Sequence, residues 1–200
     1  MNEDSSGLNQ NTTEKRVHFS TLFRRFVLYL VILAAGLSLD LGTKSWIFGQ
    51  LGRPGESETW WMIDGVFGCQ TSLNQGALFG IGQGNVHIFA LFSFAAIAGI
   101  LVWLLFFRGL CNLFFTIVLG MISAGILGNL YDRLGLHRLK WNYADELHQV
   151  GDPVYAVRDW ILVMIGNWPW PNFNIADSLL VCGAILLMVF ITFFVKDDAS

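Results

Sequence analysis

The residues best suited to chemistry are charged and amide side chains that lie within long apolar segments or at their ends. An Asp at the centre of a bilayer costs about 2.5–3.5 kcal/mol, so such residues usually face a polar interior and act there. They come from separate parts of the chain: Asp40, Lys44, Asn129, Asp132, Arg133, Asp159, Asn174 and Asp177. Because they fall at, or just beyond, the same ends of these segments, we expect them to form one site.

Two carboxylates held close together can hydrolyse a peptide bond. They do not both ionise easily, so one keeps its proton while the other acts as a base. Such a pair activates a water molecule against the carbonyl carbon and protonates the leaving amine. Asp159, on a loop, and Asp177, in the first turn of the last apolar segment, could face each other in this way. Their spacing alone does not select them, since Asp40 or Asp132 would serve nearly as well.

Each of these residues also has a purely structural explanation. Asp40 and Lys44 are four residues apart, as in an ion pair on one helix face. Asn174 followed by Asp177 is typical of a helix start, where Asn caps the helix and an acidic residue favours its dipole. The convergence of several segments at one depth nevertheless favours a functional site.

The composition places these residues in a membrane protein. Of the 200 residues, 54% are hydrophobic and 14% are charged, whereas a soluble domain carries about 25% charged residues. The mean hydropathy is +0.53, and the net charge of −3 is too small to indicate a nucleic-acid partner. Segments near the roughly 20 residues needed to cross the hydrocarbon core lie at 23–48, 86–107, 110–131 and 174–195. We predict an all-α membrane protein with four transmembrane helices, a cytoplasmic tail over 1–22 and one domain over 23–200.

Positive residues indicate the orientation of these helices. Cytoplasmic loops are enriched in Lys and Arg. Such residues precede the first helix and fill the short link between the second and third: Lys15, Arg16, Arg24, Arg25 and Arg108. Both termini are therefore predicted to be cytoplasmic, and the loops 49–85 and 132–173 to lie outside.

The two outer loops are predicted to rest on the membrane surface. Residues 58–74 are rich in aromatic and β-branched residues, interrupted by Gly65 and Gly68, which favours short strands. Tryptophans that fit an interfacial aromatic belt are Trp60, Trp61, Trp168 and Trp170. Apolar residues recur every three or four positions in 134–158, which predicts an amphipathic interfacial helix: Leu136, Leu139, Tyr143, Leu147 and Val150.

Five short blocks resemble, in order, those of the lipoprotein signal peptidase (signal peptidase II) family. The blocks are Asp40-Leu-Gly-Thr-Lys44, Asn74-Gln-Gly-Ala-Leu-Phe-Gly80, Gly128-Asn-Leu-Tyr-Asp-Arg133, Val157-Arg-Asp-Trp160 and Phe173-Asn-Ile-Ala-Asp-Ser178. One block alone is a weak signal, but the ordered set is specific. The stretch 134–158 is longer than the family usually has.

The resemblance implies an aspartyl endopeptidase of the bacterial inner membrane that cuts prolipoproteins before a diacylglyceryl-modified cysteine. It implies a small extracytoplasmic β-sheet that cradles the substrate, with the active site near the outer face. The catalytic pair would be Asp159 and Asp177. A supporting and substrate-binding set would comprise Asp40, Lys44, Asn74, Gly76, Asn129, Asp132, Arg133 and Asn174. The expected partners are prolipoproteins and membrane lipids, with no metal or organic cofactor, and the protein is expected to be a monomer.

Other functions stay open on the sequence alone. A presenilin-type protease would use Tyr131-Asp132, but Gly151-Asp152 lacks the first glycine of the G-x-G-D partner motif. The G-x-S-x-G motif that would favour a serine protease is absent. An ion-coupled transporter could carry protons on its membrane carboxylates, although no internal repeat is visible. A metal site at Asp145, Glu146 and His148 is disfavoured because no metal-binding motif surrounds them.

Overall fold

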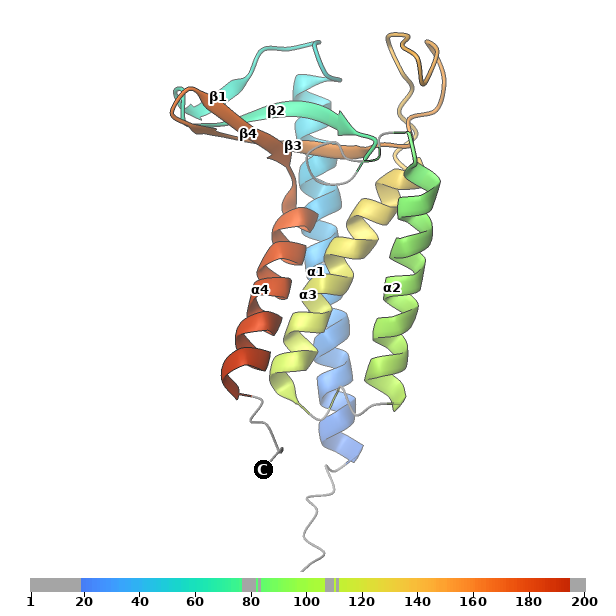
Figure 1. Ribbon diagram of the computed structural model, residues 1–200, viewed down its shortest axis with the longest axis vertical. Helices are drawn as coiled ribbons and strands as arrows, with labels where there is room; N and C mark the ends of the chain where they lie inside the picture. Colours follow the sequence, from blue (N-terminus) through green and yellow to red (C-terminus); the bar gives the residue numbers. More distant parts are fainter. Residues whose placement is uncertain (1–18, 77–81, 83, 107–109, 111, 195–200) are drawn as a thin grey trace, which may run out of the picture.

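The computed structural model describes residues 19–76, 82, 84–106, 110 and 112–194. Within these residues the chain forms four α-helices and four β-strands. In chain order the elements are α1 (Phe19–Leu51), β1 (Trp60–Ile63), β2 (Phe67–Asn74), α2 (Val86–Phe106), α3 (Leu113–Arg133), β3 (Val157–Ile165), β4 (Trp168–Phe173) and α4 (Ile175–Phe194). The helices stand side by side and the sheet lies across one end of them (Figure 1). The predicted helices and sheet are confirmed, whereas residues 1–18 of the predicted tail lie outside the described residues.

The helices follow the apolar segments of the sequence. Each is long and apolar enough to cross a membrane. Helix α1 extends beyond its predicted span of 23–48 at both ends. Asp40 and Lys44, which lie inside that span, are fully buried. Helix α3 begins at Leu113 and not at residue 110, since the Asn112 side chain accepts a hydrogen bond from the Phe114 N–H at 2.8 Å and caps the helix there.

Helix α3 lies at the centre of the bundle. It packs against α1, α2 and α4, and 56% of its apolar window is buried, compared with 11% for each of the other helices. Glycines allow this close approach: a Cβ on Gly125 would collide with the backbone oxygen of Ala176, and one on Gly128 would collide with the carboxylate of Asp40. Small residues commonly let membrane helices approach closely. The polar end of α3 is thereby pressed against both α1 and α4.

The sheet is antiparallel, with strand order β1-β2-β3-β4. Strand β3 lies beside β2 so that Asp159 is opposite Ser72. The β3–β4 hairpin then leads through Asn174 directly into α4. A hydrophobic core joins the sheet to the upper part of α1, and its buried members are Ile47, Phe48, Cys69, Trp160 and Ile161. This core fixes the sheet on the helix ends, which is what brings β3 to the polar end of α3.

The predicted interfacial helix over residues 134–158 is wrong. Lys140 and Pro153 instead pair in a short antiparallel bridge. Beside it, the Val154 backbone N–H donates to the Leu139 carbonyl oxygen at 3.0 Å. Gly135 and Gly151 turn the chain with positive φ angles, which glycine adopts easily. The residues behind the prediction do not share a buried face, because Leu139 is half-buried and the others are exposed: Leu136, Tyr143, Leu147 and Val150.

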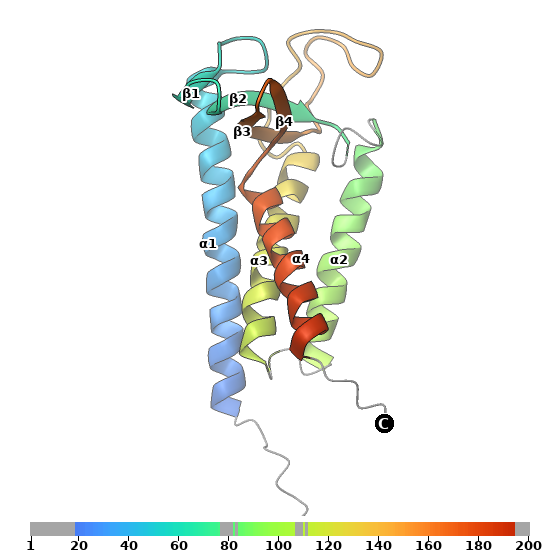
Figure 2. The same cartoon turned by 60° about the vertical axis from the view of Figure 1, so that its left-hand side comes forward.

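The two ends of the bundle differ in character. The start of α1 and the end of α4 lie at the end opposite the sheet (Figure 2). The segment 134–156 stands above α2 and α3 on the sheet side (Figure 1). Trp60, Trp168 and Trp170 are exposed on β1 and β4, and Trp61 is half-buried. The exposed tryptophans and the segment 134–156 thus lie at the sheet end of the bundle, and the two described chain ends lie at the other.

Candidate active site

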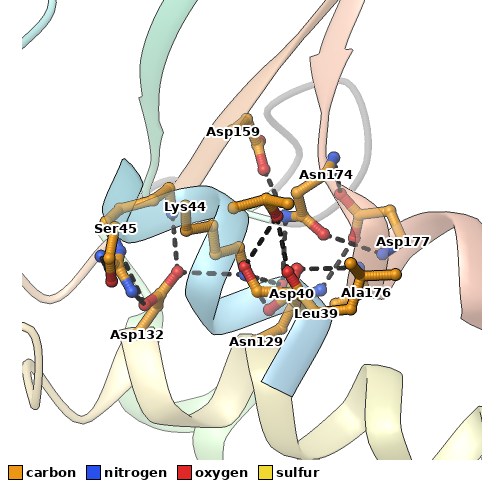
Figure 3. Close-up of polar contacts among 12 residues, drawn as sticks. Leu39, Asp40, Lys44, Ser45, Asn129, Asp132, Asp159, Asn174, Ala176 and Asp177 are labelled. Carbon is orange, nitrogen blue, oxygen red and sulfur yellow. Dashed lines mark hydrogen bonds and ion pairs between the residues drawn. The ribbon is translucent and has the colours of Figure 1, made fainter. Parts of the chain in front are cut away.

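Asn174 connects the two predicted catalytic carboxylates (Figure 3). It is fully buried between β4 and α4. Its Nδ2 donates to Asp159 Oδ1 at 2.6 Å, and its backbone N–H donates to Asp177 Oδ2 at 3.2 Å. The Asp177 N–H in turn donates to Asn174 Oδ1 at 2.9 Å. These two hydrogen bonds between Asn174 and Asp177 cap the start of α4. The residue that caps the helix is therefore also the residue that links the two carboxylates.

Asp159 occupies the drier of the two carboxylate positions. It lies on β3 and is 2% exposed. Asn74 at the end of β2 donates from Nδ2 to Asp159 Oδ2 at 3.2 Å. Burial, together with the nearby Asp177 carboxylate, raises the pKa of Asp159 to about 8. Asp159 therefore carries a proton at neutral pH and can act as an acid.

Asp177 is more accessible and is held by a different set of donors. It lies half-buried in the first turn of α4. Asn129 on α3 donates from Nδ2 to Asp177 Oδ1 at 2.7 Å, while its own Oδ1 accepts from Asn174 Nδ2 at 3.2 Å. The Asn129 oxygen also accepts from Lys44 Nζ at 3.1 Å. These bonds fix which way the Asn129 amide points, and both Asp177 oxygens accept a hydrogen bond from a neighbouring amide.

A buried ion-pair network lies directly behind the two carboxylates. Lys44 Nζ is 2.7 Å from Asp40 Oδ2 and 3.1 Å from Asp132 Oδ2, and all three side chains are 0% exposed. Asp40 Oδ1 accepts from the Ala176 N–H in the first turn of α4 at 2.9 Å. The network thus ties α1 to both α3 and α4. Removing one partner of such a pair costs about 3–5 kcal/mol, so these helix ends are held firmly in place.

Arg158 is a member of the site that the sequence analysis did not identify. Its Nε and its backbone N–H both donate to Asp132 at 3.0 Å, to Oδ1 and Oδ2 respectively. Its Nη2 lies 2.9 Å from Asp132 Oδ1, and the side chain is 4% exposed. The sequence signal that could have identified it is an arginine beside Asp159 at the start of a largely apolar strand. Neighbouring strand residues point to opposite faces, and the sequence does not reveal that both faces of β3 are covered.

The loop after β2 borders the site on a further side. The Gly76 N–H donates to Asn74 Oδ1 at 3.0 Å, and the Gly76 oxygen accepts from Arg133 Nη2 at 3.4 Å. The Arg133 guanidinium lies 5.5 Å from the centre of the Phe89 ring on α2. Residues 77–80 of the predicted block lie outside the described residues. The structure therefore brings all ten predicted site residues into one connected group.

Two alternative sites lack the required geometry. Both oxygens of Asp132 are engaged by Lys44 and Arg158, so Asp132 is not available as the free base of a presenilin-type dyad. Asp145 Oδ2 lies 3.1 Å from His148 Nε2. In the described part of the chain, however, no group of three or more His, Cys, Asp or Glu residues could hold a metal ion.

Comparison with known proteins identifies the family. The chain matches the family model described as Signal peptidase (SPase) II over residues 19–193. The chain belongs to the signal peptidase II family. A lipoprotein signal peptidase of Rhodopirellula baltica is 46% identical over 166 residues, which is 82% of this chain and 71% of that protein. The lipoprotein signal peptidase of Geobacillus thermodenitrificans is 34% identical over 174 residues, covering 87% and 95% of the two chains.

Solved structures share the fold of this signal peptidase II family member. A structure described as a bacterial membrane enzyme has a TM-score of 0.66 at 23% identity, covering 86% of this chain and 94% of that one. A second structure of the same description has a TM-score of 0.65 at 24% identity. The predicted family and fold are confirmed, and the chain is a multi-pass bacterial membrane protein. The transporter alternative finds no support in these matches.

Proposed function

We propose that this chain is an aspartic endopeptidase that removes signal peptides from prolipoproteins by cutting before the diacylglyceryl-modified cysteine. Membership of the signal peptidase II family supports the peptidase activity and the class of substrate. The observation that carries the aspartic assignment is the buried Asn174, which joins a protonated Asp159 to a half-buried Asp177. The remaining eight predicted residues position this pair and the substrate.

The proposed reaction uses one water molecule and the two carboxyl groups. Asp177 takes a proton from the water, whose oxygen attacks the carbonyl carbon of the scissile bond. Asp159 gives its proton to the carbonyl oxygen, which yields a neutral tetrahedral intermediate. When the C–N bond breaks, Asp177 passes its proton to the leaving amine and Asp159 regains its own. The raised pKa of Asp159 suits the acid in this scheme.

The place of the site suits a substrate that is anchored in lipid. Acyl chains on the cysteine hold the scissile bond near the membrane surface. The dyad lies on β3 and in the first turn of α4, and the sheet lies across the ends of the helices (Figure 1). Arg24 and Arg25 lie near the start of α1, at the opposite end. The positive-inside rule then places that end in the cytoplasm. In this proposal the protein works as a single chain among the lipids of the inner membrane, with both termini cytoplasmic and the site near the outer face.

Cleavage of a diacylglyceryl-modified prolipoprotein by the purified protein in detergent tests the dyad. Asp159→Asn and Asp177→Asn should each lower turnover by about 10²- to 10⁴-fold, because each removes a group that transfers a proton. Asp64→Asn, at an exposed carboxylate in the turn between β1 and β2, is the matched control and should keep wild-type turnover. Turnover close to wild type in either dyad variant would overturn the assignment.

A further inference from the structure

A cavity of about 300 Å³ lies between the segment 141–155 and the start of α2. The residues of its lining that matter here are Gln75, His87, Trp141, His148, Asp152 and Tyr155. The two catalytic carboxylates are not part of this lining, so the cavity is distinct from the dyad. The segment that builds it rises above α2 and α3 on the sheet side of the molecule (Figure 1).

Aromatic rings form much of the cavity wall. Trp141 is 4% exposed and stacks on His148, with ring centres 3.6 Å apart and planes within 4°. His87 and Tyr155 form a second pair, with ring centres 6.0 Å apart. The Trp141 backbone N–H donates to the Asp152 backbone carbonyl oxygen at 2.9 Å, which ties the two sides of the segment together. The wall is therefore a folded structure and not a gap between separate loops.

The charge of the wall favours a positively charged group. Among the described residues that line the cavity, Asp152 supplies a carboxylate and none is Lys or Arg. Asp152 Oδ2 accepts from the Gln149 N–H at 2.7 Å, which fixes the orientation of the carboxylate. His148 covers one face of Trp141, while Asp152 forms no ion pair with the described residues. Cations are attracted to the faces of aromatic rings such as Tyr155 and to a carboxylate nearby. An ammonium or guanidinium group therefore suits this cavity.

The loop after β2 connects the cavity to the dyad. Gln75 lines the cavity, and its neighbour Asn74 donates to Asp159. Successive Cα atoms are about 3.8 Å apart, so a peptide bound at the dyad reaches the cavity within a few residues. A signal peptide is apolar and stays in the bilayer. The part of the substrate that leaves the membrane, and so passes the cavity, is the mature segment after the cysteine.

We propose that this cavity binds a Lys or Arg side chain of the mature lipoprotein segment, a few residues after the lipidated cysteine. The proposal rests on the peptidase function proposed above and adds a preference among its substrates. The segment 134–158 would then supply recognition of the mature protein, next to the dyad but apart from it.

Binding of non-cleavable lipopeptides tests this preference. A ketomethylene group replaces the scissile amide, and one lysine is placed in turn at the second to fifth positions after the cysteine. The reference peptides carry norleucine at the same position, which keeps the apolar stem and removes the ammonium. For at least one position the lysine peptide should have a Kd about tenfold lower in fluorescence anisotropy. Equal Kd values at every position would overturn the proposal.

Variants of the cavity wall assign the preference to this place. Asp152→Asn and Tyr155→Leu remove the carboxylate and one ring, and each should bring the ratio of the two Kd values toward one. Asp64→Asn, whose carboxylate is exposed on the β1–β2 turn, should keep the wild-type ratio. If the ratio of the two Kd values stays at its wild-type value in both wall variants, the proposal is overturned. It is also overturned if added phosphatidylethanolamine abolishes the ratio in the wild-type protein, because the cavity would then bind a lipid ammonium group.

The two proposals fail in distinguishable ways. The ketomethylene peptides are not cut, so their affinities do not depend on catalysis. Failure of the wild-type protein to cleave the corresponding amides would overturn the peptidase proposal while the lysine preference was still measurable. Normal cleavage without a lysine preference would overturn the cavity proposal alone.

Discussion

Asp159 and Asp177 have the same side chain but lie in different surroundings. Asp159 is enclosed by the sheet and receives the amides of Asn74 and Asn174. Asp177 lies in the first turn of α4 and is half-buried. When environments separate two carboxyl groups in this way, one serves as acid and the other as base. The roles proposed for the two carboxyl groups therefore rest on differences in burial and hydrogen bonding.

The turnover of the enzyme should fall as the pH rises above about 8, because Asp159 then loses the proton it must donate. The hydrogen bond from Asn74 favours the ionised form of Asp159 and so lowers its pKa. Asn74→Ala should therefore shift this fall to higher pH, whatever its effect on the maximum rate. Measurement of kcat from about pH 6 to about pH 10 tests the shift, with Asp64→Asn as the unshifted control. A shift to lower pH would contradict this account of Asp159.

At the scale of elements, β3 is attached to the helices through Arg158. Its Nε donates a hydrogen bond to Asp132 on α3, and its Nη1 donates to Ser45 Oγ on α1 at 3.4 Å. The next residue along β3 is Asp159, so the attachment of the strand also sets the position of the proposed catalytic acid. A buried pair of this kind differs from Arg53 and Glu56, whose side chains are both 36% exposed.

Arg158→Ala should lower both thermal stability and turnover, since it leaves Asp132 short of a partner in a buried place, at a cost of about 3–5 kcal/mol. Arg158→Lys restores the charge but not the two-pronged contact, and should recover part of each loss. Arg53→Ala removes an exposed pair and should change stability by less than about 1 kcal/mol. Melting temperature and kcat are measured together in detergent. A melting temperature for Arg158→Ala equal to that of Arg53→Ala would contradict the view that Arg158 attaches β3 to the helices.

Elements differ in how far their sequences reveal them. The helices could be predicted because a bilayer demands a long apolar run, and the burial of Asp40 and Lys44 followed from the cost of charge at that depth. The segment 134–158 could not, since spacing of apolar residues does not show which of them share a face once Gly135 and Gly151 turn the chain. Arg158 was missed for a related reason: its partner Asp132 is distant in sequence, and only the fold brings them together.

At the scale of the whole molecule, the proposed active site lies at the end of the bundle opposite Arg24 and Arg25. The proposed orientation places Ser20 of α1 in the cytoplasm and Asp64 outside. A membrane-impermeant maleimide should therefore label Asp64→Cys in cells whose inner membrane is intact but exposed. It should label Ser20→Cys only after that membrane is broken. The wild-type chain, with its own cysteines, gives the background, and the reverse pattern would contradict the orientation.

The contact between Asp40 and Lys44 also bears on how the chain enters the bilayer during synthesis. Helix α1 leaves the ribosome before α3 and β3, which carry Asp132 and Arg158. Until those elements arrive, Lys44 has a counter-charge one turn away on its own helix. The lipid-crossing part of α1 is thus neutral from the start. Asp132 at the end of α3 and Arg158 on β3 follow as a second pair of opposite charges, so completing the network adds no net charge.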